Sequence, residues 1–333
     1  MKSNQSIKAP GLKYIILMFL FIGLSILIYI YWYFQVSENS KNYLINYKEK
    51  LSHQDIKIEW AEIETKGFPY RIEQNINDIK IKFNDHIIES KNIKFINQPW
   101  NFRHFLIKLE NNINLQNKDQ SIKILNENLI SSLIIEKDLT KRLSIQSNLL
   151  NILFRDISIK LLMPEFHFRS TNKENIEAFI SANTLLINDL NSMQIDKIII
   201  EADILNANNL NNQSLISWSI MNGGIDIKNF TFIINNNPLY FNGFLGLDKN
   251  SEILSSISLK GQGVEDLLKI MKKKNIINSD IYKASNLIIK TINISSKLID
   301  KEPTYSLNSQ NGELYFMNIK LLKLVDLKKY FLN

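Results

Sequence analysis

Cysteine is absent from the 333 residues of this chain. Its absence excludes disulfide bonds, thiolate-bound zinc, iron–sulfur clusters and cysteine nucleophiles. It leaves the compartment open, because a chain without cysteine is stable on either side of a membrane. Glycine is also scarce, with 10 residues, which argues against glycine-rich phosphate loops and dinucleotide-binding folds.

Histidine is the next rarity, and the four that occur form no metal-binding or catalytic pattern. No HxH or HxxxH pair joins His53, His86, His104 and His167, and no cysteine can complete a zinc site. His104 and His167 stand beside aromatic residues in expected strands, so we interpret both as structural. No GxSxG, P-loop or Rossmann pattern occurs, and Gly261-Gln262-Gly263 fits a turn from a strand into a helix. We therefore expect no cofactor, no metal and no enzymatic activity.

Charged residues are 22% of the chain and apolar residues 45%, a mixture typical of folded proteins. The 40 Lys and Arg against 33 Asp and Glu give a net charge of 40 − 33 = +7. Acids are interleaved with bases along the whole chain, so the excess does not form a nucleic-acid-binding surface. We expect no nucleic-acid partner.

The strongest feature is an apolar run from Tyr14 to Phe34 that contains no charge. As a helix it would be about 31 Å long, enough to cross the hydrocarbon core of a bilayer. The basic residues Lys2, Lys8 and Lys13 precede it, which favours an N-terminus in the cytoplasm and the remainder across the membrane. Aromatic residues crowd Tyr29–Tyr33, as expected for a membrane interface.

A cleaved signal peptide is the alternative interpretation of this run. Its length exceeds the roughly 7–15 apolar residues of a signal peptide, and the bulky Trp32–Gln35 offers no small-residue cleavage site. We therefore expect an uncleaved anchor, with a cytoplasmic stub and transmembrane helix over residues 1–36 and one domain over residues 37–333. Residues 37–53 predict a short amphipathic helix that continues from the anchor and rests on the membrane surface.

From residue 56 onward apolar and polar residues alternate, which predicts half-buried strands. Two stretches differ: Val264–Met271 has helical spacing, and Ser279 predicts the N-cap of a second helix that runs to about Ile289. Residues 140–155 fit neither pattern clearly. We expect an α+β, mainly β fold in which the transmembrane helix precedes a large curved antiparallel sheet, as a groove, open barrel or sandwich, with a few packed helices.

Several phrases follow one another in a characteristic order. They are Lys66-Gly67-Phe68-Pro69-Tyr70-Arg71, Gln98-Pro99-Trp100-Asn101-Phe102-Arg103-His104, Trp218-Ser219, Gly223-Gly224-Ile225-Asp226-Ile227, Pro238–Asp248 and Asn311-Gly312-Glu313-Leu314. Over nearly the whole chain this order resembles the family catalogued as domain of unknown function 2125 (DUF2125), single-pass proteins of proteobacterial inner membranes. The resemblance implies an inner-membrane anchor and a periplasmic domain, and it transfers no catalytic residue.

The motif residues also have structural interpretations. They are Gly67, Phe68, Pro69, Pro99, Trp100, Trp218, Gly223, Gly224, Gly243, Asp248 and Gly312. Gly67 and Pro69 predict a bend at a strand end, and the glycine pairs suit turns or close strand crossings. We expect Trp100, directly after a proline, to anchor a loop in the core.

The phrase Pro238–Asp248 also resembles a strand–turn unit of AsmA-like envelope proteins, whose long curved sheets form an apolar trough implicated in phospholipid movement. This likeness concerns the fold alone. It implies a membrane-anchored periplasmic protein that binds or conveys lipid, or another apolar envelope component, with membrane lipids and other envelope proteins as partners. The alternative is a non-enzymatic envelope scaffold whose apolar core is packed against itself.

Overall fold

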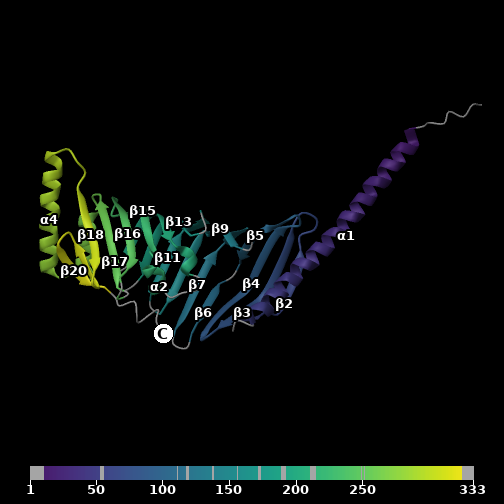
Figure 1. Cartoon of the computed structure of the whole chain (residues 1–333), viewed down its shortest axis with the longest axis horizontal. Coiled ribbons are helices and arrows are strands. Elements are labelled where there is room, and N and C mark those ends of the chain that lie inside the picture. The colour runs from purple at the N-terminus through teal and green to yellow at the C-terminus, as the bar shows by residue number, and fades with distance from the viewer. Residues whose placement is uncertain are drawn as a thin grey trace, which may run out of the picture.

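The structure, a computed structural model, describes residues 11–52, 56–110, 112–117, 120–136, 139–155, 157–171, 174–188, 193–210, 215–248, 250 and 252–324. Their strands join into one antiparallel sheet of 20 strands, which extends along the horizontal axis of Figure 1. Helix α1 (Gly11–Ser52) leaves one end of this sheet, and helix α4 (Ser279–Leu298) lies at the other. The expected fold class, mainly β with an N-terminal apolar helix and a large antiparallel sheet, is confirmed.

The remaining helices are η1 (Ala207–Leu210), α2 (Leu215–Ile220) and α3 (Val264–Lys273). The strands are β1 (Ile56–Glu59), β2 (Glu62–Lys66), β3 (Ile72–Phe83), β4 (His86–Gln98), β5 (Asn101–Leu109), β6 (Ile113–Gln116), β7 (Ser121–Glu127), β8 (Leu129–Glu136), β9 (Leu139–Gln146), β10 (Leu149–Phe154), β11 (Ile157–Leu162), β12 (Glu165–Ser170), β13 (Ile176–Asn188), β14 (Met193–Leu205), β15 (Gly224–Ile234), β16 (Asn237–Leu247), β17 (Ile253–Lys260), β18 (Thr304–Gln310), β19 (Glu313–Phe316) and β20 (Ile319–Lys323). The ambiguous segment 140–155 thus forms β9 and β10.

Helix α1 is continuous, so the apolar run and the segment after it form a single rod. Its most apolar window is long enough to cross a membrane and is 0% buried inside the protein. The C-terminal half contacts β1, β2 and β3, where Ser37 is buried and its carbonyl accepts a hydrogen bond from Gln74 Nε2 at 3.3 Å. This half therefore packs on the sheet. The expectation that it also rests on the membrane surface stays a prediction.

A line of changed strand pairing and irregular backbone crosses the sheet from strand to strand. Strand β4 pairs with β5 along one half and with β6 along the other, and β13 pairs in the same divided way with β12 and β11. Along this line Asp78, Asn128, Met163 and Lys197 have left-handed backbones, with φ of 50°, 55°, 49° and 48°. An irregular residue of this kind bends a strand. We call this line the crease.

In β13 and β14 the apolar side chains occupy even-numbered positions on one side of the crease and odd-numbered positions on the other. Between β13 and β14 the apolar partners are Ile180 and Ile200 on one side, and Leu185 and Ile195 on the other. Ile195 and Phe230, the latter the β15 partner of Ile200, pack against the same buried cluster. The shift at the crease therefore keeps the apolar side chains of both halves on one face of the sheet.

The fully buried core lies at the end of the sheet farthest from α1. Leu239 and Leu259 of the strands pack there against Leu268 of α3 and Ile289 of α4. Helix α3 forms where its apolar spacing predicts it. Helix α4 is longer than predicted, because it continues to Leu298 with further apolar residues at helical spacing.

The predicted cap of α4 is corrected by one residue. Asn278, not Ser279, is the N-cap, since its side chain accepts a hydrogen bond from the backbone N–H of Ile281 at 2.8 Å. The amide oxygen of asparagine satisfies a free N–H of the first turn as well as a serine hydroxyl would.

Candidate functional site

The apolar face of the sheet carries rows of side chains that cross many strands. The aromatic row contains Phe95, Ile107, Ser131, Ile145, Phe166, Ile180, Ile200 and Phe230. The isoleucine row, across the crease, contains Ile113, Ile124, Ile152, Ile159 and Ile187. Consecutive members of each row are cross-strand partners, whose Cβ atoms lie about 4.5–5.5 Å apart. The isoleucine row is thus a continuous apolar stripe, and the aromatic row is apolar except at Ser131, which is buried.

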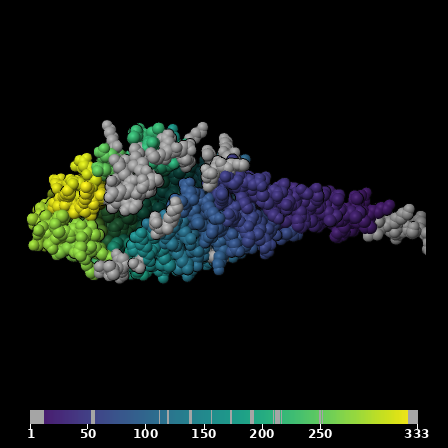
Figure 2. Space-filling view, turned by 90° about the horizontal axis from the view of Figure 1, so that it is seen from below, coloured from purple at the N-terminus to yellow at the C-terminus, as the bar shows by residue number. Residues whose placement is uncertain are grey.

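Both rows are half-buried along most of their length, whereas the core under α3 and α4 is fully buried. Helix α1 covers β1–β3 at one end, and α3 and α4 cover the other. In the part of the chain that the structure describes, no helix packs extensively on β5–β13. Figure 2 shows the surface hollowed between the two covered ends. We call the apolar face of β4–β14 between these helices the trough.

The total surface is larger than that of a compact protein. The solvent-accessible surface is 22106 Å², against about 14,000 Å² expected for a compact protein of 38.9 kDa. The apolar window of α1, which is 0% buried, and the elongated shape of the sheet both contribute to the excess.

The opposite face of the sheet carries charged side chains, interspersed with apolar ones such as Leu153 and Phe179. Its cross-strand ion pairs include Lys80–Glu89 at 2.6 Å and Lys228–Asp203 at 2.7 Å. The pKa of the Lys80 and Lys228 ammonium groups is raised because each donates a hydrogen bond to its partner carboxylate. These charges are well hydrated, so the two faces of the sheet differ in what they can bind.

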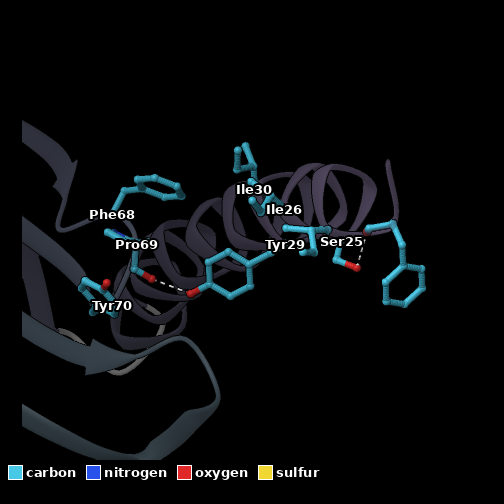
Figure 3. A pocket seen from close by; sticks show the side chains of 9 residues that line it. Ser25, Ile26, Tyr29, Ile30, Phe68, Pro69 and Tyr70 are labelled. Carbon is cyan, nitrogen blue, oxygen red and sulfur yellow. Dashed lines mark hydrogen bonds between the residues drawn. The ribbon is translucent and has the colours of Figure 1, made fainter. Parts of the chain in front are cut away.

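A cleft lies where α1 leaves the sheet (Figure 3). Its volume is about 510 Å³, and its lining residues are Phe21, Ile22, Ser25, Ile26, Tyr29, Ile30, Phe68, Pro69 and Tyr70. The Tyr29 hydroxyl donates a hydrogen bond to the Pro69 carbonyl at 2.5 Å, as the dashed line in Figure 3 shows. Six of these residues belong to the apolar run of α1, which is long and apolar enough to cross a membrane.

The histidines do not gather into a site. His104 Nε2 lies 2.8 Å from Ser132 Oγ, His167 Nε2 lies 3.4 Å from a Glu165 oxygen, and the His86 ring stacks on Phe83. His53 lies outside the described residues. Among the described residues, no group of three or more His, Asp or Glu side chains is placed to hold a metal ion.

The phrase from Lys66 to Arg71 forms the loop between β2 and β3. Gly67 has φ 104°, and a Cβ there would lie 2.5 Å from the Arg71 carbonyl oxygen, so the predicted bend requires glycine. The Phe68–Pro69 peptide bond is cis. Tyr33, which is 2% exposed, donates a hydrogen bond to the Arg71 carbonyl at 3.0 Å. The loop is therefore fixed against α1.

Trp100 is not where we expected it. Pro99 is buried, but Trp100 is 59% exposed at the turn between β4 and β5. The expectation that Trp100 anchors this loop in the core is wrong, because Gln98 pairs with Asn101 and the two-residue turn leaves the indole outside the sheet.

The motif residues around α2 pack against one another. Trp218 is buried and its indole N–H donates to the Leu205 carbonyl at 2.8 Å, while a Cβ at Gly223 would lie 2.4 Å from that indole nitrogen. A Cβ at Gly224 would meet the Phe244 ring at 2.4 Å. Both glycines thus admit close packing of aromatic rings.

The other motif residues shape turns and a close strand crossing. Gly243 has φ 144°, and a Cβ there would lie 2.1 Å from the Ser256 carbonyl oxygen of the neighbouring strand. Asp248 accepts backbone hydrogen bonds from Asn250 and Glu252 at 2.8 and 2.9 Å. Gly312, with φ 68°, forms the turn into β19.

These motif features all lie within one matched region. A family model described as "Uncharacterized protein conserved in bacteria (DUF2125)" matches residues 46–324. The chain belongs to the DUF2125 family. The resemblance inferred from the motif order is thereby confirmed. No curated protein and no solved structure matches the chain.

The sequence analysis missed the crease and the cleft. Asp78 and Asn128 offered a signal, since asparagine and aspartate adopt the left-handed backbone more readily than other residues. Met163 and Lys197 offered none, because their bends depend on the neighbouring strands. The cleft joins residues about 40 positions apart, as the Tyr29–Pro69 contact shows, and no local pattern indicates it.

Proposed function

We propose that this DUF2125 protein binds acyl chains of membrane lipids, or another apolar envelope component, in the trough. The observation that carries the proposal is the half-buried state of both rows between two covered ends. An apolar face left open in this way is unfavourable in water and favourable against hydrocarbon.

The expected gain is moderate for each methylene group. Full burial contributes about 0.8 kcal/mol per CH₂, and a chain covered on one side gains roughly half of that. About 14 methylene groups would then contribute on the order of 6 kcal/mol, before the loss of freedom on binding is subtracted. Such a ligand binds reversibly, which suits a protein that conveys lipid.

The length of the trough suits acyl chains. The aromatic row crosses β4, β5, β8, β9, β12, β13 and β14 in hydrogen-bonded order. Six spacings of about 4.8 Å give roughly 29 Å. The hydrocarbon core of a bilayer, two acyl chains thick, is about 30 Å. Two chains end to end, or one lipid with its chains extended, fit this span.

The proposal includes a location. The apolar half of α1 anchors the chain in the bacterial inner membrane, with its N-terminus in the cytoplasm and the sheet in the periplasm. Lys13 before the apolar run and the aromatic residues at its far end support this orientation; Lys2 and Lys8 lie outside the described residues. The AsmA-like phrase Pro238–Asp248, which forms β16 and the turn after it, supports lipid as the ligand class.

The test is the amount of lipid that the full-length protein retains. The protein is extracted in a mild detergent, freed of loosely bound lipid by gel filtration, and analysed by mass spectrometry per mole of protein. Ile152 and Ile159 are adjacent in the isoleucine row. The double variant Ile152→Lys/Ile159→Lys should retain at least about fivefold less lipid, because losing about 1 kcal/mol of apolar contact changes occupancy by that factor.

A matched control lies on the opposite face of the same two strands. Leu153 and Ser158 are cross-strand partners there, so Leu153→Lys/Ser158→Lys adds the same charges outside the trough. It should retain lipid as the unmodified protein does. Equal lipid in all three proteins, or a stoichiometric protein partner with no retained lipid, would contradict the proposal and favour the scaffold alternative.

A further inference from the structure

The end of the sheet beside α1 exposes large aromatic side chains on two loops. Phe68 is 50% and Tyr70 76% exposed between β2 and β3, and Trp100 is 59% and Phe102 44% exposed at the start of β5. The two loops are neighbours, because β3 and β4 are paired up to Ile72 and Asn97. These four residues form one surface, which we call the aromatic edge.

Contacts with α1 set the depth of the aromatic edge relative to a membrane. The loop carbonyls of Pro69 and Arg71 accept hydrogen bonds from Tyr29 and Tyr33 at 2.5 and 3.0 Å. The Phe68 ring stacks on Phe34 with centroids 6.2 Å apart. Tyr29–Phe34 is the last part of the apolar run. The aromatic edge therefore lies beside the point where the helix leaves the hydrocarbon.

The chemistry of the aromatic edge fits that depth. Tyrosine and tryptophan favour the boundary between hydrocarbon and headgroups, where the ring is in an apolar layer and the polar group stays hydrated. Arg103, which directly follows Phe102, can bind lipid phosphates. The Arg71 guanidinium pairs with Glu73 at 3.1 Å, but its side chain remains 60% exposed beside Tyr70. The cleft beneath the β2–β3 loop has apolar walls that reach Phe21 and Ile22, which suits contact with acyl chains.

We propose that the aromatic edge is a second membrane contact, which rests in the headgroup layer of the leaflet where α1 emerges. The contact holds the α1 end of the sheet against the bilayer and limits how far the sheet can tilt about the helix. It rests on the proposed membrane anchoring by α1 but not on the trough, so it stands or falls independently of lipid binding there.

The test uses the absence of cysteine, which makes every engineered cysteine the only one in the chain. Full-length Tyr70→Cys carries a nitroxide label and is reconstituted into vesicles of phosphatidylethanolamine and phosphatidylglycerol. Power-saturation EPR then compares collisions with oxygen, which concentrates in the bilayer, and with a water-soluble nickel complex. The oxygen-to-nickel collision ratio at the Tyr70 label should exceed that of a label in water, since oxygen becomes more concentrated and the nickel complex less concentrated from water toward the hydrocarbon.

Two positions on α1 calibrate the measurement. Tyr31 is 69% exposed within the apolar run, and Tyr43 is 64% exposed on the part of α1 beyond it. The oxygen-to-nickel ratio at Tyr70 should lie near that of Tyr31→Cys and well above that of Tyr43→Cys; Trp100→Cys should agree with Tyr70→Cys. A ratio equal to that of Tyr43→Cys overturns the proposal. Low collision rates with both reagents also overturn it, because they indicate that protein covers the aromatic edge.

Discussion

A lysine in the trough should be tolerated far better than a truncation in the closed core. Ile152, in the middle of the isoleucine row, is half-buried, whereas Leu239 is 0% exposed beneath α3 and α4. The proposed variants are Ile152→Lys and Leu239→Ala. Their effects on stability distinguish an apolar face that is open from one that is covered by protein. Lipid binding in the trough requires an open face, whereas the scaffold alternative requires a covered one.

The magnitudes follow from the burial of each site. Full burial of isoleucine contributes about 1.5–3 kcal/mol, so its half-buried side chain at position 152 contributes roughly 1 kcal/mol. A lysine keeps its alkyl stem on the surface and extends its ammonium group into water. We expect Ile152→Lys to cost about 1 kcal/mol. Leu239→Ala removes buried methyl groups and leaves a cavity, which costs about 2–5 kcal/mol.

The measurement is urea unfolding of the full-length protein in detergent micelles, followed by far-ultraviolet circular dichroism. Leu153→Lys, on the opposite face of the same strand, is the control and should cost about as little as Ile152→Lys. A loss of more than about 3 kcal/mol for Ile152→Lys, comparable to Leu239→Ala, would refute the reasoning. The trough would then be sealed, and its apolar rows would be core.

Three further predictions concern single contacts. Gly243→Ala should destabilise the protein by about 2 kcal/mol or more in the same urea assay. The backbone at position 243 has a φ of 144°, and a Cβ there would lie 2.1 Å from the Ser256 carbonyl oxygen, so an alanine cannot be placed without backbone strain. An unchanged unfolding midpoint would contradict this prediction. Tyr33→Phe should lower the free energy of unfolding by about 1 kcal/mol and make the β2–β3 loop more susceptible to proteolysis, since the Arg71 carbonyl loses its hydrogen-bond donor. Equal cleavage rates for the variant and the unmodified protein would show that this hydrogen bond does not fix the loop. Tyr305 is 2% exposed, and burial, with a smaller effect of the Glu265 charge, raises the pKa of its hydroxyl. Its neutral form therefore stabilises the fold fully below the ordinary tyrosine pKa of about 10, and this stabilisation is lost as pH rises through the folded pKa. The unfolding midpoint of Tyr305→Phe should fall less steeply above about pH 10 than that of the unmodified protein, and parallel curves would argue against this assignment.

Local patterns in the sequence were sufficient for the main elements. The uncharged run Tyr14–Phe34 predicted an apolar helix, and alternation from residue 56 predicted strands, because both depend on residues that are close together in the chain. The α3 helix was predicted correctly for the same reason. The order of short motifs was enough to indicate the family that the match to residues 46–324 establishes.

The tertiary structure decided which apolar surfaces are closed and which are open. Alternation is the same in a strand under α4 as in a strand of the trough, so Leu239 and Ile152 could not be told apart from sequence. The difference arises because the helices cover only the two ends of the sheet. The structure also placed Trp100 outside the core and brought Pro69 to Tyr29, because both positions depend on pairing between distant segments. Periodicity is a local property of the chain, whereas burial depends on what long-range folding brings to each face.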